Sequence, residues 1–188
     1  MDRAVSHVSK TCYLELRRLS QIRPFIDESA TKKLVLSFVI SRIDYCNSLF
    51  KGIPDDKIKK LQKIQNHGAR LVKKISKSEH IDPILKQLHW LPIKSRINYK
   101  IATLTYQCVN DPSFPPYLKD LVHLYKPARE LRSQNKSMMY KPRVHFKNYG
   151  ERSFNYTGPD VWNSLPQPLL SAESLSIFKN MTKTWLFT

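Results

Sequence analysis

Apolar residues along the first two-thirds of the chain recur every three or four positions, which is the spacing of one face of an α-helix. The first such run predicts a helix that ends near Pro24. Its buried face comprises Val5, Val8, Cys12, Leu16 and Leu19. Asp27 is the expected N-cap of a second helix, which continues to about Phe50, and Ser29 is an alternative cap. Apolar residues cover most of this second helix, so it is expected to be central, and a strand over residues 34–40 is the competing prediction.

Gly52 and Pro54 break the chain before a third helix, predicted over residues 55–77. Asp55 and Asp56 favour its positive N-terminal dipole. Seven residues gather on its apolar side: Ile58, Leu61, Ile64, Gly68, Leu71, Val72 and Ile75. The opposite side carries what we call the basic stripe, which consists of Lys59, Lys63, Asn66, Arg70, Lys73 and Lys77. The third helix is therefore expected to pack on one side and to present five positive charges on the other.

Proline residues mark most of the remaining element boundaries. Asp82 and Pro83 are expected to open a short helix to about His89, with Asp82 as its N-cap, and Pro92 to open a longer one. The inner face of the longer helix is expected to hold Ile93, Ile97, Ile101, Leu104 and Cys108. A turn over residues 111–116 then precedes another short helix.

The periodicity fades from Lys126 to about Tyr149, where a short strand or hairpin over residues 138–144 is the most that the pattern supports. A turn is predicted at Gly158 and Pro159, and Ser171 is the expected cap of a last helix. One face of that helix would hold Leu175, Phe178, Thr182, Trp185 and Leu186.

These elements predict a mainly α-helical fold, a bundle of about five to seven helices with an irregular basic segment and a C-terminal helix. Two regions are expected, residues 1–125 and residues 126–188, either separate or packed as one unit. Three tryptophans are the expected structural anchors: Trp90, Trp162 and Trp185.

The net charge of the 188-residue chain is +17, and it is unevenly distributed. Residues 51–100 carry 13 basic and 4 acidic side chains, whereas residues 151–188 carry 3 of each. An excess confined to a few elements indicates a surface that binds a polyanion. A second group of basic residues follows in the irregular segment, at Lys126, Arg129, Arg132, Lys136, Lys141, Arg143 and Lys147. Tyr125, Tyr140, Phe146 and Tyr149 are interleaved with it, a combination that suits single-stranded nucleic acid unless the aromatic residues belong to the core.

No apolar stretch reaches the length of a membrane span, and the start of the chain has no hydrophobic signal segment. Three scattered cysteines, Cys12, Cys46 and Cys108, are expected as buried free thiols. Together these features predict an intracellular chain of the nucleus or cytoplasm, neither secreted nor bound to a membrane.

We find no pattern typical of a catalytic, metal or cofactor site. The chain has no G-x-S-x-G sequence, no phosphate-binding loop and no dinucleotide fingerprint. His80 and His89 are too far apart for a typical zinc pair, and Asp55 and Asp56 are better explained as residues of a helix start. We therefore expect no enzymatic activity and no cofactor.

Seven blocks of the sequence nevertheless resemble, in order, one family. They are SRIDYCNSLFKGIP, LQKIQNHGARLV, HIDPILKQLHWLPIKSRINYK, PPYLKDLV, RELRSQN, YGERSFNYTGPDVWNSLP and SLSIFKNMTKTWLF. The family is that of the jockey-like, LINE-type non-LTR retrotransposon reverse transcriptases, in the region that follows the polymerase palm. The resemblance extends from about Val8 to Phe187, and the HWLP block is among its most specific parts.

The resemblance implies a thumb-like helical region and a basic tail, with neither the endonuclease domain nor the palm aspartates that bind the catalytic metals. The only Asp-Asp pair, Asp55 and Asp56, matches a different block. The implied partner is the backbone of RNA or DNA, bound weakly and without sequence preference by the basic stripe and the second basic group. Two alternatives are a helical module that binds a protein, either the missing palm or a second copy through residues 34–39, Phe178 and Trp185, and a decayed element with no selected function.

Overall fold

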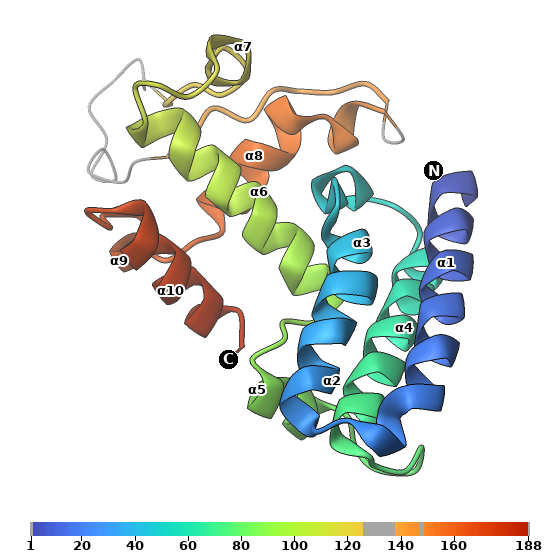
Figure 1. Ribbon diagram of the computed structural model, residues 1–188. Helices are drawn as coiled ribbons and strands as arrows, with labels where there is room; N and C mark the ends of the chain where they lie inside the picture. The colour runs from blue at the N-terminus through green and yellow to red at the C-terminus, as the bar shows by residue number, and fades with distance from the viewer. Residues whose placement is uncertain (1, 126–137, 147–148, 188) are drawn as a thin grey trace. The chain divides into compact units, whose positions relative to one another are not determined.

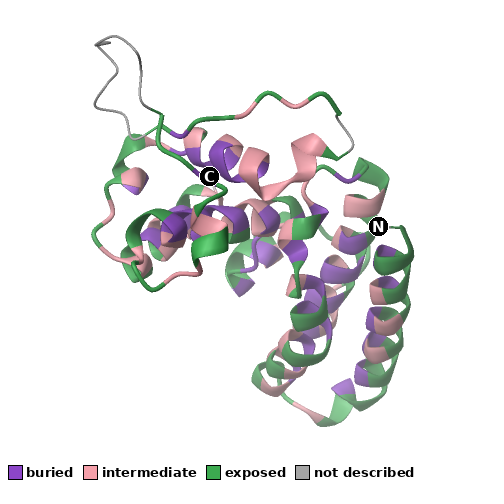
Figure 2. Cartoon of the chain, turned by 90° about the horizontal axis from the view of Figure 1, so that it is seen from above, coloured by how far each residue is buried: buried purple, intermediate pink, exposed green. Residues whose placement is uncertain are grey.

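A computed structural model describes residues 2–125, 138–146 and 149–187 (Figure 1). The described residues are mainly helical and contain no strand, which confirms the predicted fold class. The chain divides into two compact units, Met1–Arg96 and Ile97–Thr188. Residues 97–125, which the sequence grouped with the first region, therefore belong to the same unit as the C-terminal residues. Most helices have one buried and one exposed side, as amphipathic packing requires, whereas residues 101–108 of the helix over Ile93–Asn110 are all buried or half-buried (Figure 2).

Three long helical segments form the first unit. They are α1 (Asp2–Ile22), the run α2 (Glu28–Val35), η2 (Leu36–Ile40) and α3 (Ser41–Asp44), and α4 (Asp55–Lys73). Short 3₁₀ turns follow α1 and α3, at η1 (Arg23–Phe25) and η3 (Asn47–Phe50). The helix α4 packs against α1, α2 and α5 (Asp82–Leu88). Each of the three predicted long helices is thus present.

The second helical segment begins where it was predicted and ends earlier. Asp27 is its N-cap, because its carboxylate accepts a hydrogen bond from the Ala30 amide at 2.7 Å, so Ser29 is not the cap. The competing strand over residues 34–40 is wrong. Those residues continue the helix through a π-turn, in which the Ser41 amide donates to the Leu36 carbonyl. The segment ends at Asp44 rather than Phe50 because Cys46 adopts a left-handed conformation, with φ of 51°.

The buried face of α4 meets the other two long helices at a glycine. A Cβ on Gly68 would lie 2.9 Å from Cγ1 of Val35 and 3.7 Å from Cδ2 of Leu16. Because that position has no side chain, α4 approaches α2 and α1 more closely than an alanine would allow.

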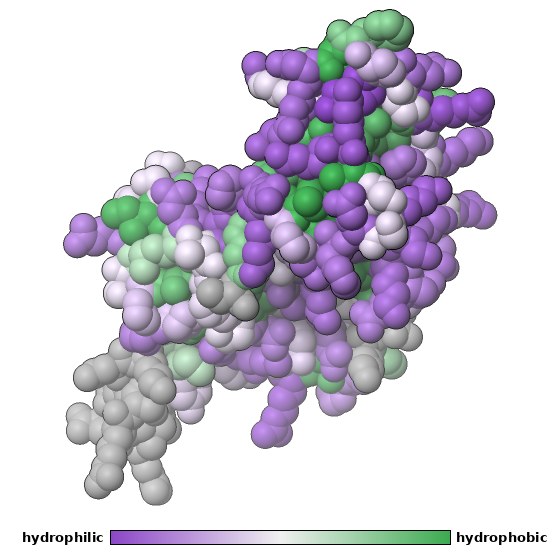
Figure 3. Space-filling model, turned by 90° about the horizontal axis from the view of Figure 1, so that it is seen from below, coloured by the Kyte–Doolittle hydropathy of each residue, from purple (hydrophilic) through white to green (hydrophobic). Residues whose placement is uncertain are grey.

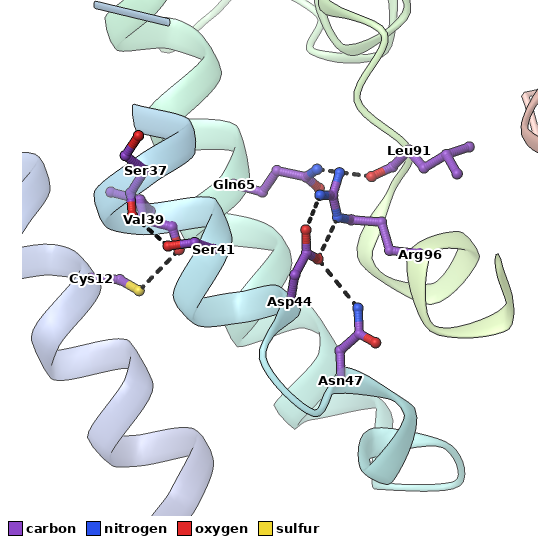
Figure 4. Close-up of polar contacts among 9 residues, drawn as sticks. All are labelled: Cys12, Ser37, Val39, Ser41, Asp44, Asn47, Gln65, Leu91 and Arg96. Carbon is purple, nitrogen blue, oxygen red and sulfur yellow. Dashed lines mark hydrogen bonds and ion pairs between the residues drawn. The ribbon is translucent and has the colours of Figure 1, made fainter. Parts of the chain in front are cut away.

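Two glutamine side chains of α4 hold the segment that carries the HWLP block, and Figure 4 shows one of them, Gln65. The fully buried Gln65 donates from Nε2 to the Leu91 carbonyl at 2.8 Å, and Gln62 accepts from the Ile93 amide at 2.8 Å. These bonds pair polar groups that would be costly to bury alone. Trp90, the residue before Leu91, lies in the core with 3% of its surface exposed.

An ion pair joins the end of α3 to residue 96 of the first unit. The Arg96 guanidinium donates to both carboxylate oxygens of Asp44, at the end of α3, and Asn47 donates to the same carboxylate (Figure 4). The preceding short helix α5 differs from its prediction in one detail: Asp82 is its first residue and Ile81 is the N-cap.

The second unit is built around α6 (Ile93–Asn110), whose first four residues belong to the first unit. Its other elements are α7 (Pro116–Lys119), η4 (Gly150–Arg152), α8 (Phe154–Asn163), α9 (Gln167–Leu170) and α10 (Leu175–Trp185). The core holds a group of three aromatic rings. Tyr106 stacks on Phe178 with ring centres 4.4 Å apart, and Trp162 lies 6.2 Å from Phe178.

Two predicted boundaries in this unit are wrong. Gly158 and Pro159 are buried inside α8 rather than in a turn, because the small Gly158 lets α8 lie against Thr105 of α6. Ser171 ends α9, and the last helix is instead capped by Ser174, whose hydroxyl accepts from the Ile177 amide. Tertiary packing overrides the local signal in the first case, and a separate short helix intervenes in the second.

The hairpin expected over residues 138–144 is reduced to one isolated antiparallel bridge. The bridge pairs Leu124 with Met139. On its other side, the Asn163 side chain bonds both the amide and the carbonyl of Met139, at 2.8 and 3.0 Å. The described part of the irregular segment is thus held between residues 123–125 and α8.

Candidate nucleic-acid interface

The helix α4 presents its basic residues because its apolar side is occupied by packing. Leu61, Ile64 and Val72 are fully buried. On the opposite side, at a helical spacing of three and four, Lys59 and Lys63 are exposed, and the remaining basic-stripe residues on the helix, Asn66, Arg70 and Lys73, are half-buried. Asp55 and Asp56 lie in the first turn, where the N-terminal dipole favours negative charge. The expected amphipathic arrangement of this helix is therefore present.

Within the basic stripe, Lys59 and Lys63 differ from the later residues. Both are exposed, and neither has an ion pair among the described residues. Lys73 instead pairs with Glu28 of α2 at 2.6 Å. Arg70 is half-buried and donates to the carbonyls of residues 76, 77 and 79. The later residues of the stripe are thus engaged with the protein itself.

Lys77 does not lie on α4, which corrects the predicted length of the stripe. The helix ends at Lys73, and Lys74 adopts a left-handed conformation, with φ of 54°. Arginines from two elements stabilise this end. Arg23 of η1 donates to the carbonyls of Leu71 and Val72, both at 2.9 Å, while Arg70 binds the loop that follows. A guanidinium at the negative end of a helix is favourable both as a cap and through the dipole.

Two exposed lysines outside the predicted stripe extend the basic surface of α4. Lys60 lies beside Lys59, and Lys74 follows the end of the helix. Lys60 was not predicted as part of the stripe because a helical projection places it at the border of the apolar face. We call the exposed set Lys59, Lys60, Lys63 and Lys74 the α4 lysine group.

His67 lies on the same side of α4, with its ring centre 6.2 Å from that of Tyr13 in α1. Burial, and then the positive charges of Lys77 and Arg70, lowers the pKa of His67 from its usual value. A lowered pKa leaves the imidazole neutral at pH 7. The positive charge of this surface at neutral pH therefore comes from lysine and arginine.

Most of the second basic group lies outside the described residues. Those positions are Lys126, Arg129, Arg132, Lys136 and Lys147. Of the two that are described, Arg143 is exposed. Lys141 is paired with Asp160 of α8 at 2.7 Å and lies 4.4 Å from the centre of the Tyr156 ring. The hydrogen bond to Asp160 is the main cause that raises the pKa of Lys141, so its charge is present but compensated.

The aromatic residues interleaved with this group are on the surface, not in the core. Tyr125 and Tyr140 expose about half of their surface, at 51% and 52%, and Phe146 and Tyr149 expose 74% and 85%. The sequence left open whether these rings were buried. Their exposure agrees with the binding interpretation and removes the alternative that they are core residues.

A cavity of about 530 Å³ lies beside the described basic residues of this segment. Lys141, Arg143 and His145 line it together with Tyr156 and Glu151. Its lining therefore carries charges of both signs. Of the three expected anchors, Trp90 and Trp162 are buried, while Trp185 exposes 37% of its surface.

The residues expected to form a protein-binding surface are largely committed to the core. Val35, Val39 and Phe178 are fully buried. Phe38 and Trp185 are partly exposed. Cys46 also departs from its prediction, because it is exposed whereas Cys12 and Cys108 are buried. The left-handed turn at Cys46 carries its side chain away from the helix face on which it was expected.

Hydrophilic side chains predominate on the face drawn in Figure 3, and hydrophobic side chains gather there in small separate patches. Among the described residues, no three His, Cys, Asp or Glu side chains are grouped so that they could hold a metal ion. None of the helices in the described ranges has the length and apolar content needed to cross a membrane.

Comparisons with protein-family models, with curated proteins and with solved structures find no match to this chain.

Proposed function

We propose that this chain is the non-catalytic region that follows the palm in a jockey-like reverse transcriptase, and that it binds the phosphate backbone of RNA or DNA. The order of the seven sequence blocks supports the family origin. The observation that carries the binding proposal is the α4 lysine group, a set of exposed cations along α4 and at its C-terminal end.

Charge and geometry favour a polyanion over a small ligand. Lys59 and Lys63 lie one helical turn apart, and Lys60 follows Lys59 directly. Flexible, exposed ammonium groups can contact successive phosphates without a fixed register, which gives binding without sequence preference. Each contact releases condensed counterions, so the affinity falls as salt rises.

The test compares two variants of equal net charge. One replaces Lys59, Lys60 and Lys63 by Gln, and the control replaces Lys33, Lys86 and Lys94, which are also exposed, by the same residue. Affinity for RNA and DNA is measured by fluorescence anisotropy over a range of salt concentrations. We expect the first variant to reduce the slope of log K against log salt by about 2 to 3, at roughly 0.7 to 0.9 for each phosphate that is no longer neutralised.

The control should reduce the slope much less. An unchanged slope in the first variant, or equal reductions in both, would remove α4 from the interface. The purified chain with Mg²⁺ or Mn²⁺ should not extend a primer, and extension would overturn the non-catalytic part of the proposal. Failure to bind either polynucleotide at low salt would favour the decayed-element alternative.

A helical protein-binding module is the second candidate, and large exposed side chains in the first unit favour it. Phe25 exposes 86% of its surface and Tyr45 77%. Exposed aromatic residues are enriched in protein interfaces. Under this alternative, light scattering should show a size that rises with concentration, and neither RNA nor DNA should be retarded.

A further inference from the structure

The isolated bridge in the second unit sorts its side chains onto two sides. The Tyr125 amide donates to the Met138 carbonyl and the Tyr140 amide to the His123 carbonyl, both at 2.8 Å. Leu124 and Met139 are directly opposite each other in this arrangement. Successive side chains of extended chains alternate between two faces. His123, Tyr125, Met138 and Tyr140 therefore share the face opposite to that of Met139.

Met139 is turned toward the protein, whereas Leu124, which lies opposite it on the same face, exposes 51% of its surface. Met139 exposes only 3% of its surface, and Asn163 of α8 bonds both of its backbone groups. Lys141, two residues after Met139 and on the same side, forms an ion pair with Asp160 of α8. These contacts hold Met139 and Lys141 against α8, and the four side chains on the other face of the bridge are exposed.

The solvent face combines aromatic and other flat or polarisable groups. Tyr125, Tyr140 and Met138 expose 51%, 52% and 36% of their surface, and His123 is also exposed. Diagonal neighbours on such a face are roughly 7 to 8 Å apart, which is the separation that the register gives Tyr125 and Tyr140. We call these four residues the tyrosine platform.

The net charge of the chain, +17, favours an anionic ligand for the tyrosine platform. Arg143 and His145 follow Tyr140 closely in the chain and are exposed. Of the acidic side chains nearby, Asp160 is paired with Lys141, and Glu151 lines the cavity beside Arg143. Exposed aromatic rings next to exposed basic side chains match the two parts of a single strand, the base face and the phosphate.

We propose that the tyrosine platform stacks with unpaired bases of single-stranded nucleic acid. This inference rests on the proposed function and adds the form of nucleic acid that the second unit selects. Bases in a duplex are stacked on each other, so the platform cannot reach their faces without disrupting the helix. The α4 lysine group contacts phosphates, which both forms present. The two surfaces therefore make different contributions to affinity.

The experiment measures binding of the full chain to a fluorescein-labelled oligouridine and to a labelled hairpin duplex at about 50 mM salt. The test variant is Tyr125→Ala with Tyr140→Ala. The matched control is Tyr45→Ala with Tyr117→Ala, which removes two tyrosines that are at least as exposed at other places. Stacking contributes about 1 to 3 kcal/mol per base, so the test variant should lose on the order of tenfold or more in affinity for oligouridine.

Three further readouts separate stacking from other effects. The affinity for the hairpin and the slope of log K against log salt should stay unchanged in the test variant, since no charge is removed. Tyr125→Phe with Tyr140→Phe should bind oligouridine as the wild type does, because the rings remain. Circular dichroism checks that each variant is folded.

The outcomes also distinguish this inference from the function on which it rests. If the wild type binds neither probe, the proposed function fails. If the wild type binds oligouridine and the test variant binds it equally well, or if the control pair or the hairpin shows the same loss, only the tyrosine platform is refuted.

Discussion

The thiols of Cys12 and Cys108 lie in the cores of the first and second units, and burial raises the pKa of each to about 11. Cys46 is exposed at the left-handed turn that ends α3. A thiol reacts through its thiolate, and a group with a pKa of about 11 is charged in roughly one molecule in a thousand at pH 8. Burial also blocks access to reagents. The three thiols of this chain therefore differ strongly in reactivity.

We predict that one thiol of the native chain reacts with Ellman's reagent at pH 8 and that all three react in denaturant. The Cys46→Ser variant should lose the reaction in the native state. Because the folded-state pKa of the other two is raised, their reaction should increase only as pH rises toward that value. Rapid labelling of Cys12 in the folded chain would contradict the burial described above.

The environments of some single residues were predictable from local sequence, and those of others were not. The N-cap role of Asp27 was predictable, because it depends on a side chain and an amide three residues away. The burial of Trp90 was expected too, but the glutamines that hold its segment come from α4 and leave no local signal. The exposure of Cys46 follows from a backbone conformation that non-glycine residues seldom adopt, so periodicity alone placed it on the wrong side.

At the scale of elements, Gly68 sets the distance between α4 and α2. In an exposed helix, replacing glycine by alanine stabilises by about 1 kcal/mol. Here the new Cβ would lie 2.9 Å from Cγ1 of Val35, a stiff β-branched side chain, so the two helices must separate. We predict that Gly68→Ala lowers the free energy of unfolding by about 1 to 3 kcal/mol in chemical denaturation.

The partner substitution provides the control. In a Val35→Ala background the close approach is relieved, and Gly68→Ala should then be neutral or stabilising. A double-mutant cycle measures this coupling directly. Stabilisation by Gly68→Ala in the wild-type chain would show that the helices are not held at contact distance.

The bounds of the elements were predictable at their beginnings more often than at their ends. Asp55 begins α4 as expected, since proline and carboxylates mark a helix start locally. Its end at Lys73 depends on Arg23, which is distant in sequence and binds the last carbonyls from another element. The basic stripe was therefore overestimated by one residue at its far end, and two of its charges proved to be engaged with the protein.

At the scale of the whole molecule, basic side chains outnumber acidic ones by 32 to 15. The ion pairs among the described residues are mostly on the surface, where such pairs contribute little. Repulsion among the excess cations therefore outweighs attraction within the pairs. The free energy of unfolding should consequently rise when salt screens this repulsion.

We predict that the thermal unfolding midpoint rises when salt increases from about 10 mM to about 150 mM, because the Debye length falls from about 30 to about 8 Å. Thermal melts followed by circular dichroism measure this, and sodium chloride should be used so that a specific anion does not bind. A midpoint that falls with salt would mean that the ion pairs dominate.

The helical class of the molecule was predictable because an amphipathic period of 3.6 residues is a strong signal over long segments. The grouping of residues 97–125 with the C-terminal residues was not, because it depends on rings such as Tyr106, Trp162 and Phe178, which meet from three separate helices. The positive charge of the candidate interface was predictable from the sequence. Which of its side chains form ion pairs was not. Ion pairs such as that of Lys141 with Asp160 join residues that no local pattern connects.

The π-turn at η2 has a consequence for the length of the second helical segment. Four of the buried residues there, Thr31, Val35, Val39 and Ile43, follow a constant step of four, and Ile40 is buried beside them. An ideal helix of 3.6 residues per turn would rotate such a row steadily away from its neighbours, and one wide turn takes up part of that rotation. The π-turn thus contains one residue more than an α-helical turn. Deleting one residue within 36–40 would convert the π-turn into an ordinary α-helical turn. A deletion elsewhere in this helical segment would instead rotate the buried residues that follow it away from their neighbours.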